Sequence, residues 1–248
     1  MLLQHCAWPE VEAYLEKSTG VIVPIGSTEQ HGPNGLVGTD ALCPQVLAEA
    51  AGEREGIMVA PTLSIGMAQH HLDFPGSITL RPRTLMAVVY DVVQSLARHG
   101  FSHIYFLNGH GGNINTVQAA FAEYYSDYSL HKGPSCEAQT RLKMGNWFAG
   151  GRVKQISAER FGDKEGSHAT CSEISLTQYA YPESIKDVGL SPEQAPEGHF
   201  RDAVDFRRQF PDGRIGAASG LANPETGKAL FEAGIADLLD EYRAFLDS

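Results

Sequence analysis

The sequence predicts an α/β protein in which a mostly parallel central sheet lies between two layers of helices. Short apolar runs alternate with amphipathic helical patterns along the first half of the chain. Several of these runs end in segments rich in glycine and polar residues. Strands that alternate with helices are joined by crossover connections, which produce a parallel sheet covered on both faces. No linker or long charge run divides the 248 residues, so we expect one domain over residues 1–248.

The individual elements follow from the spacing of apolar residues. We expect strands at residues 20–26, 57–65 and 103–107. Helical spacing predicts helices over residues 40–53, 84–99 and from 113 to about 125. The second half is less regular, and there we expect a strand at 135–142, helices at 169–181 and 229–245, and long loops over 186–227.

Composition excludes several classes of function. The formal net charge is −11, and a protein that binds nucleic acid needs clustered Lys and Arg to neutralise phosphates. The apolar runs are too short to cross a bilayer, and no signal-peptide pattern is visible. The four cysteines are scattered without a CxxC pair, which disfavours a zinc-thiolate site. We therefore expect a cytoplasmic protein with reduced thiols and neither nucleic-acid nor membrane partners.

Polar side chains cluster where the predicted strands end. Glu29 and His31 follow the first strand, Asp40 opens the next helix, and His110 follows the third strand. In open α/β sheets, ligands bind in the crevice beyond the carboxyl ends of the strands. These four side chains are therefore expected to converge although they span a long stretch of sequence.

Two carboxylates and two imidazoles match the ligand preferences of Zn²⁺, Mn²⁺ or Fe²⁺. If the backbone there is extended, the side chains of Glu29 and His31 point the same way. Asp40 has two oxygens and could bridge two ions, which in hydrolases commonly lie ~3.5–4 Å apart. The glycines that flank His110 would let the backbone turn sharply and leave room for a substrate.

Each of these residues also has an ordinary structural role. Asp40 could be a helix N-cap, and a single buried histidine is often a hydrogen-bonded structural residue. A glycine-rich segment after a strand can cradle phosphate, although residues 109–113 lack the Lys-Ser/Thr of a P-loop and the G-x-G-x-x-G fingerprint. A phosphate- or nucleotide-binding α/β protein is thus an alternative, and it predicts stabilisation by phosphate and no metal.

Four segments occur in order with characteristic intervals. They are GSTEQHGP at 26–33, GTD at 38–40, HLDFPG at 71–76 and NGHGGN at 108–113. Together they resemble the creatininase (creatinine amidohydrolase) family over about residues 15–180. The segment EGSH at 165–168, followed by Ser172 and Glu173, resembles a later histidine and glutamate segment of the family.

The resemblance implies a three-layer α/β/α fold, two divalent metal ions and hydrolysis of C–N bonds in small amides or formamides, some of them cyclic. It also implies a homo-oligomer, often a hexamer. By motif position the metal ligands are expected to be Glu29, His31, Asp40 and His110, with Asp40 bridging. Glu173 matches a further carboxylate, a ligand or an acid–base group, and His168 matches a proton-transfer histidine. For substrate binding we expect His71, Gly111, Gly112 and Asn113.

The chain also departs from creatininase itself. Creatininase carries a metal-binding glutamate two residues after the histidine that His110 matches, and this chain has Gly112 there. Glu173 or water is therefore expected to supply the missing ligand. Creatininase surrounds its flat substrate with tryptophans, and no tryptophan lies near Glu165. The chain looks more like the wider family, which includes formamide deformylases and a mycofactocin peptidase, or it is a non-catalytic metal-binding protein of this fold.

Overall fold

A four-stranded, all-parallel sheet forms the centre of the molecule, which confirms the predicted fold class. The computed structural model describes the chain except for residues 132–138. The spatial order of the strands is β2-β1-β3-β4. Their bounds are Gly20–Ile25 for β1, Met58–Val59 for β2, His103–Asn108 for β3 and Arg141–Asn146 for β4.

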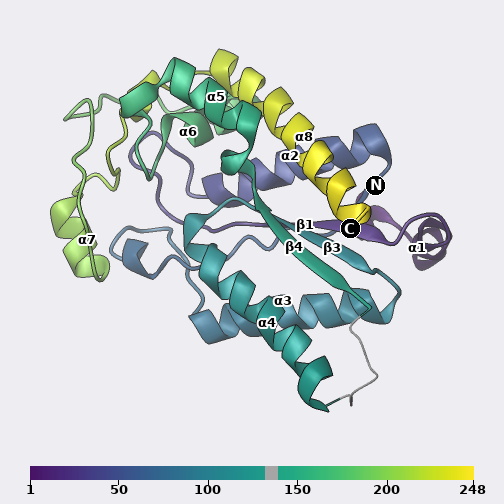
Figure 1. The fold of residues 1–248 in the computed structure, drawn as a ribbon. Coiled ribbons are helices and arrows are strands. Elements are labelled where there is room, and N and C mark those ends of the chain that lie inside the picture. Colours follow the sequence, from purple (N-terminus) through teal and green to yellow (C-terminus); the bar gives the residue numbers. More distant parts are fainter. Residues whose placement is uncertain (132–138) are drawn as a thin grey trace.

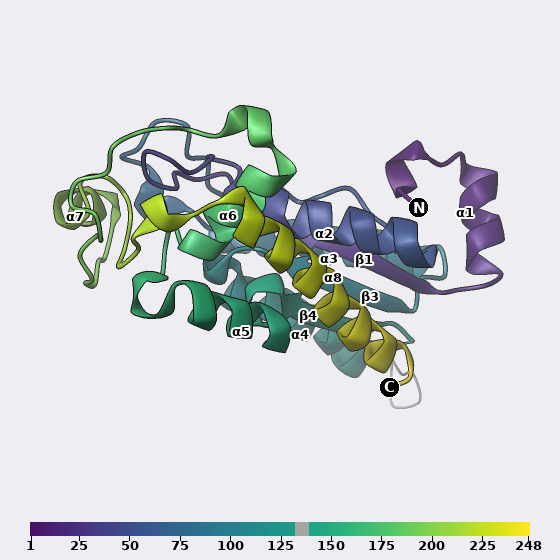
Figure 2. The ribbon, with the colours of Figure 1, turned by 90° about the horizontal axis from the view of Figure 1, so that it is seen from above.

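Helices cover both faces of the sheet and make three layers (Figures 1 and 2). One face carries α2 (Thr39–Glu55), α5 (Gly151–Arg160), α6 (Cys171–Ala180) and α8 (Pro224–Leu246). The other face carries α3 (Pro82–Arg98) and α4 (Ile114–His131), with α1 (Trp8–Leu15) at the edge of that layer. The short helix α7 (Ala203–Gln209) lies away from both layers. Among the described residues, no helix is both long and apolar enough to span a bilayer.

The two layers of helices explain why β1 is apolar throughout. All six of its residues are buried, because successive side chains point to opposite faces and both faces are covered. Ile22 packs into the core cluster that includes residues of α2, α6 and α8. Val21, Val23 and Ile25 pack into the cluster that includes residues of α1, α3 and α4.

Most predicted elements are present, with shifted bounds. The expected strand at 57–65 is much shorter: only Met58–Val59 pair as β2, and one isolated bridge joins Leu63 to Ile25. The regular ladder stops here, and Pro61 lies between the last two backbone hydrogen bonds to β1, from Ala60 N–H to the oxygen of Ile22 and from Leu63 N–H to the oxygen of Pro24. Of the expected strand at 135–142, residues 135–138 lie outside the described residues, and β4 begins at Arg141. Helices α1, α5 and α7 were not predicted.

The connections create a crevice at one end of the sheet. From β1 the chain crosses to β2 on one side and then returns to β3 on the other, so the strand order reverses between β1 and β3. This reversal opens a crevice beyond the carboxyl ends of the two strands. The first turn of α2 closes in there, because a Cβ at Gly26 or Gly109 would overlap the backbone oxygen of Asp40. Glycine at both positions thus allows α2 to bring Asp40 to the ends of the strands.

Candidate metal centre

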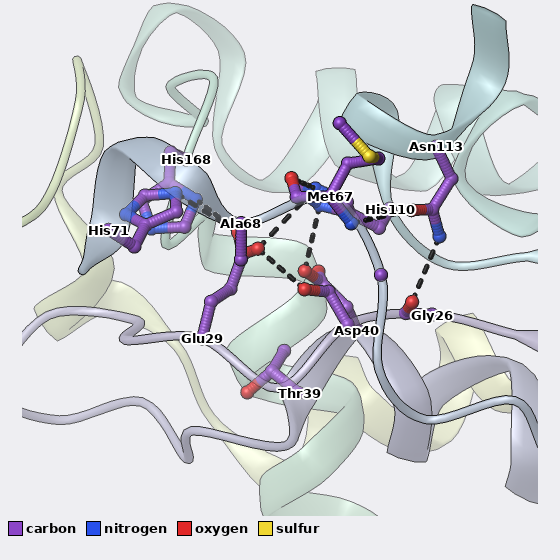
Figure 3. A network of polar contacts seen from close by, with 12 residues as sticks. Gly26, Glu29, Thr39, Asp40, Met67, Ala68, His71, His110, Asn113 and His168 are labelled. Atoms are coloured by element: carbon purple, nitrogen blue, oxygen red, sulfur yellow. Dashed lines mark hydrogen bonds and ion pairs between the residues drawn. The ribbon is translucent and has the colours of Figure 1, made fainter. Parts of the chain in front are cut away.

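Four predicted side chains meet at the carboxyl ends of β1 and β3, and Figure 3 shows three of them, Glu29, Asp40 and His110. Glu29 and His31 come from the segment after β1, His110 follows β3, and Asp40 lies in the first turn of α2. All four are buried, with exposed fractions of 0% for Glu29 and at most 7% for the others. Buried ionisable groups are stable when they are paired or bind a metal. The convergence expected from the sequence is therefore present in the fold.

Backbone carbonyls orient the two imidazoles. His31 Nδ1 lies 3.0 Å from the oxygen of Glu29, and His110 Nε2 lies 2.9 Å from the oxygen of Met67. A carbonyl only accepts, so these nitrogens carry the protons. The opposite nitrogens face Asp40, with His31 Nε2 3.2 Å from Oδ1 and His110 Nδ1 2.9 Å from Oδ2. Histidines that bind metals are commonly held in this way, with the other ring nitrogen on a carbonyl.

Two groups of donor atoms share Asp40. One consists of Glu29, Asp40 and His110, and the other of His31, Asp40 and Glu173; within each group the donor atoms lie within 4.8 Å of one another. Glu29 Oε1 and Asp40 Oδ2 are buried and accept no hydrogen bond within the described residues. Oxygen and imidazole donors in these combinations fit divalent first-row metals. The residues present therefore fit a pair of ions with a shared carboxylate.

Glu173 both caps helix α6 and lies beside the second group of donors. It lies in the first turn of α6, where its Oε1 accepts a hydrogen bond of 2.6 Å from the backbone N–H of Thr170, and its own N–H is donated to Thr170 Oγ1. This reciprocal arrangement is a helix capping box. The same Oε1 is 3.8 Å from His31 Nε2. The cap therefore holds the carboxylate of Glu173 beside the second group of donors.

Gly112 occupies the position where creatininase has a glutamate. A Cβ at Gly112 would overlap His110 Nε2 and lie 2.9 Å from the oxygen of Met67. No side chain fits there while His110 keeps its bond to Met67. The carboxylate of Glu173 reaches the second group of donors from α6.

The pKa values of the centre show that its carboxylates favour positive charge beside them. Burial raises the pKa of Glu29, and burial also raises the pKa of Glu173 to about 7. Burial alone would lower the pKa of His31 and His110, but the neighbouring carboxylates outweigh it and raise both pKa values to about 10. The same two imidazoles outweigh burial at Asp40 and hold its pKa well below the usual range. Without a metal, the carboxylates thus keep the two histidines protonated. Divalent ions can take the place of these protons.

A cavity of about 640 Å³ lies over this centre. Eight predicted site residues line it, namely Glu29, Asp40, His71, His110, Gly111, Gly112, His168 and Glu173. Asn113 is not part of the lining; its side chain accepts from the N–H of Met67 and donates to the oxygen of Gly26, so it ties the loops together behind the site.

Several lining residues carried no signal in the sequence. They include Trp147 and Phe148 after β4, Lys154 of α5, and the pair His70 and Phe200, whose rings stack. Trp147 and Phe148 follow the carboxyl end of a strand, so the rule that located His110 would have found them had β4 been placed correctly. The thiol of Cys171 lies nearby, but burial raises its pKa to about 12, as in a packed, unreactive thiol.

A doubly wound α/β fold with a buried cluster of carboxylates and imidazoles at its switch point is the arrangement of a class of metal-dependent hydrolases. The sequence profile of the creatininase family (creatinine amidohydrolase) matches residues 4–241. Creatinine amidohydrolase of Pseudomonas putida is 34% identical over 251 residues, which cover 94% of each chain. The chain therefore belongs to the creatininase family and is a hydrolase.

Two further similarities mark the breadth of this family. The 3-dehydro-scyllo-inosose hydrolase of Thermotoga maritima is 25% identical over 93% of this chain and 78% of its own length. The structure of a mutant creatininase of the Zn-Zn type matches with a TM-score of 0.82 and 22% identity, covering 98% of this chain and 97% of the other. This structural match supports the same fold.

Proposed function

We propose that the chain binds two divalent ions and hydrolyses a C–N bond in a small amide or formamide. One observation carries the proposal: the two groups of donors, Glu29 with His110 and His31 with Glu173, share the carboxylate of Asp40. In this assignment Glu173 takes the place of the glutamate that creatininase has at the position of Gly112. Zn²⁺ and Mn²⁺ suit such a mixture of oxygen and nitrogen donors, and a creatininase of the Zn-Zn type shares the fold.

Bound divalent ions in such centres make water a nucleophile at neutral pH and polarise a carbonyl oxygen. The protein must then move the proton to the leaving nitrogen. His168 is placed for this role, because it lines the cavity and its Nδ1 lies 3.8 Å from Glu29 Oε1. Burial and the neighbouring imidazoles hold the pKa of His168 well below its ordinary value, so it is neutral and able to accept a proton.

The size and lining of the cavity support a small substrate. Its volume of about 640 Å³ falls within the range of small-molecule sites. Aromatic rings at Trp147, Phe148 and Phe200 give it apolar walls, while the carboxylates and imidazoles lie at its base. The homo-oligomer, a hexamer by family resemblance, and the cytoplasmic location stay predictions.

The test combines metal analysis with turnover. The protein is stripped with a chelator, reloaded with Zn²⁺ or Mn²⁺, and assayed against cyclic amides, formamides and short peptides. We expect two ions per chain, no turnover by the stripped protein and recovery on reloading. Full hydrolytic activity in a thoroughly stripped sample would overturn the mechanism, and two bound ions without turnover on any amide would favour the non-catalytic alternative.

The loop after β3 supports the phosphate-binding alternative less well than it supports the metal centre. Gly109 is required for packing, since a Cβ there would overlap the backbone of Asp40. The cavity beside the loop contains the carboxylates of Glu29, Asp40 and Glu173, which repel an anion in the absence of metal. Stabilisation of the metal-free protein by inorganic phosphate would argue for that alternative.

A further inference from the structure

Gln30 lies between the two metal-facing residues of the segment after β1, but its side chain points elsewhere. It is buried and reaches three distant parts of the chain. Its Nε2 lies 2.9 Å from His71 Nδ1, 2.9 Å from His168 Nε2 and 2.8 Å from the backbone oxygen of Gly213. The side-chain amide of Gln30 therefore contacts both His71 and His168, whose rings lie beside the carboxylate of Glu29.

Backbone groups fix which way this amide faces. Gln30 Oε1 accepts a hydrogen bond of 2.8 Å from the N–H of Gly32, and Nε2 donates to the oxygen of Gly213. A rotation of the amide by half a turn would set a donor against a donor and an acceptor against an acceptor. The loop of Gly213 fits closely here, because its φ is +88° and a Cβ would overlap Gln30 Oε1. The orientation of the amide is thus determined by the backbone alone.

The orientation of the amide determines the tautomer of His71. One Nε2 hydrogen of Gln30 goes to the oxygen of Gly213. His168 Nε2 lies 2.8 Å from the backbone oxygen of Gln30 and donates to it, so the second hydrogen of Gln30 goes to His71 Nδ1, which is then an acceptor. An imidazole whose Nδ1 accepts a hydrogen bond carries its single proton on Nε2. His71 Nε2 lies 3.1 Å from Glu29 Oε1. The protonated nitrogen of His71 therefore lies beside the carboxylate of Glu29, at ion-pair distance without the alignment of a hydrogen bond.

The same residue determines the tautomer of His168. His168 Nε2 lies 2.8 Å from the backbone oxygen of Gln30, which can only accept, and 2.9 Å from Gln30 Nε2. The contact with the carbonyl is the shorter, so we assign the proton to His168 Nε2, and no hydrogen bond then joins the two nitrogens. The lone pair is then on Nδ1, which faces Glu29 Oε1 at 3.8 Å. Two acceptors at this separation leave room between them for a proton donor or a cation. The rings of His71 and His168 stack with centroids 4.4 Å apart, so they are held as a unit.

We propose that Gln30 is a positioning residue: its side-chain amide sets the tautomer of His71, so that His71 Nε2–H lies beside Glu29, and its backbone carbonyl sets that of His168, which leaves His168 Nδ1 as the proton acceptor in the cavity. The role of His168 as acceptor rests on the proposed hydrolytic function, whereas the two tautomers do not. In metal sites, partners of this kind orient the groups that bind the metal or the substrate, and their loss typically lowers activity ~10- to 100-fold.

The first test reads the tautomers directly. Long-range ¹H–¹⁵N correlation spectra of the Zn²⁺-loaded protein distinguish protonated from unprotonated ring nitrogens, and spectra of His71→Gln and His168→Gln assign the two rings. We expect both rings as neutral Nε2–H tautomers in the unsubstituted protein. A proton on Nδ1 of either ring would overturn the proposal. The result does not depend on any substrate, so it separates this proposal from the proposed hydrolysis.

The second test removes the donor. In Gln30→Glu a carboxylate oxygen replaces the amide nitrogen, so His71 Nδ1 loses its donor and the ring must take a proton there. We expect the His71 signals to change to those of the Nδ1-protonated ring, and kcat to fall ~10- to 100-fold while KM changes less than about threefold.

The matched control is Gln118→Glu, the same change at an exposed position on α4, which should leave spectrum and kcat unchanged. If Gln30→Glu folds with an unchanged His71 spectrum, Gln30 does not set the tautomer. If that variant does not fold, the spectra of the unsubstituted protein still decide the question.

Discussion

Gly111 and Gly112 are neighbours in the sequence with opposite surroundings. A Cβ at Gly112 would overlap the ring of His110, whereas a Cβ at Gly111 would meet nothing within 4 Å. We therefore expect Gly112→Ala to displace His110 and lower both metal affinity and kcat at least tenfold, since ligand geometry is lost. Gly111→Ala is the control and should retain both. Metal titration and steady-state kinetics check this, and equal behaviour of the two variants would contradict the assignment of His110.

Asp40 is the residue on which both groups of donors depend. Asp40→Asn keeps the size of the side chain but removes its charge, and an amide is a poor bridging ligand. We expect this variant to bind less than one ion per chain and to lose at least a thousandfold in kcat, as measured by elemental analysis and amide turnover. Asp91→Asn, at an exposed position of α3, is the control for the loss of one negative charge. Retention of two ions by Asp40→Asn would rule out a bridging role.

The four residues placed by sequence reasoning share one property: each directly follows or opens an element whose pattern is strong. Glu29, His31 and His110 follow β1 or β3, and topology brings the ends of these strands together whatever the loops do. Gln30 had no such signal, because its partner Gly213 is 183 residues away in an irregular segment. Lys154 and Phe200 likewise depend on how residues 147–217 return to the site, which local pattern does not encode.

At the scale of elements, α6 positions the carboxylate that completes the second group. The cap formed by Thr170 and Glu173 supports both the helix end and the orientation of Glu173. Thr170→Ala removes one of its two hydrogen bonds and should lower the free energy of unfolding by about 1 kcal/mol, as N-cap substitutions do.

We also expect Thr170→Ala to weaken binding of the second ion more than that of the first, because only the second group includes Glu173. Urea unfolding and stepwise metal titration measure the two effects. Thr84→Ala, near the start of α3, serves as a comparison outside the site. Equal weakening of both ions would show that α6 does not hold a ligand.

Strong patterns located elements well, and weak ones did not. Helix α3 has four buried apolar residues on one stripe, and its predicted span differs from the observed one by two residues or fewer at each end. Helix α5 buries only Val153, so its sequence has almost no apolar stripe to detect. The pairing of β2 ends early, at Val59, although the apolar run continues. The elements that were missed are those held by tertiary contacts instead of by their own periodicity.

At the scale of the whole molecule, the acidic balance of the chain extends into its candidate centre. The net charge is −11, and the centre gathers the carboxylates of Glu29, Asp40 and Glu173. In the metal-free protein, protons on His31 and His110 offset these carboxylates. Protons and metal ions should therefore compete for this centre, and stability should depend on pH in opposite ways with and without metal.

The direction of this dependence follows from the pKa shifts. The pKa values of His31 and His110 are raised from 6.5 to about 10, and that of Glu173 is raised to about 7. A folded state that binds protons more tightly than the unfolded chain is stabilised below the ordinary pKa and loses that stability as pH rises through the shifted value. The melting temperature of the metal-free protein should thus fall steadily between pH 6.5 and 10.

The Zn²⁺-loaded protein should show the reverse trend over the lower part of this range, because its ligands must be deprotonated and metal affinity increases with pH. Thermal melts of both forms from pH 6 to 9.5 measure the two slopes. A metal-free double variant, His31→Gln with His110→Gln, tests the cause: its slope should be much flatter, since the groups that hold the extra protons are gone. A metal-free protein as stable at pH 9.5 as at pH 6.5 would show that these carboxylates do not hold protons on the histidines, and the electrostatic case for two cations would fail with it.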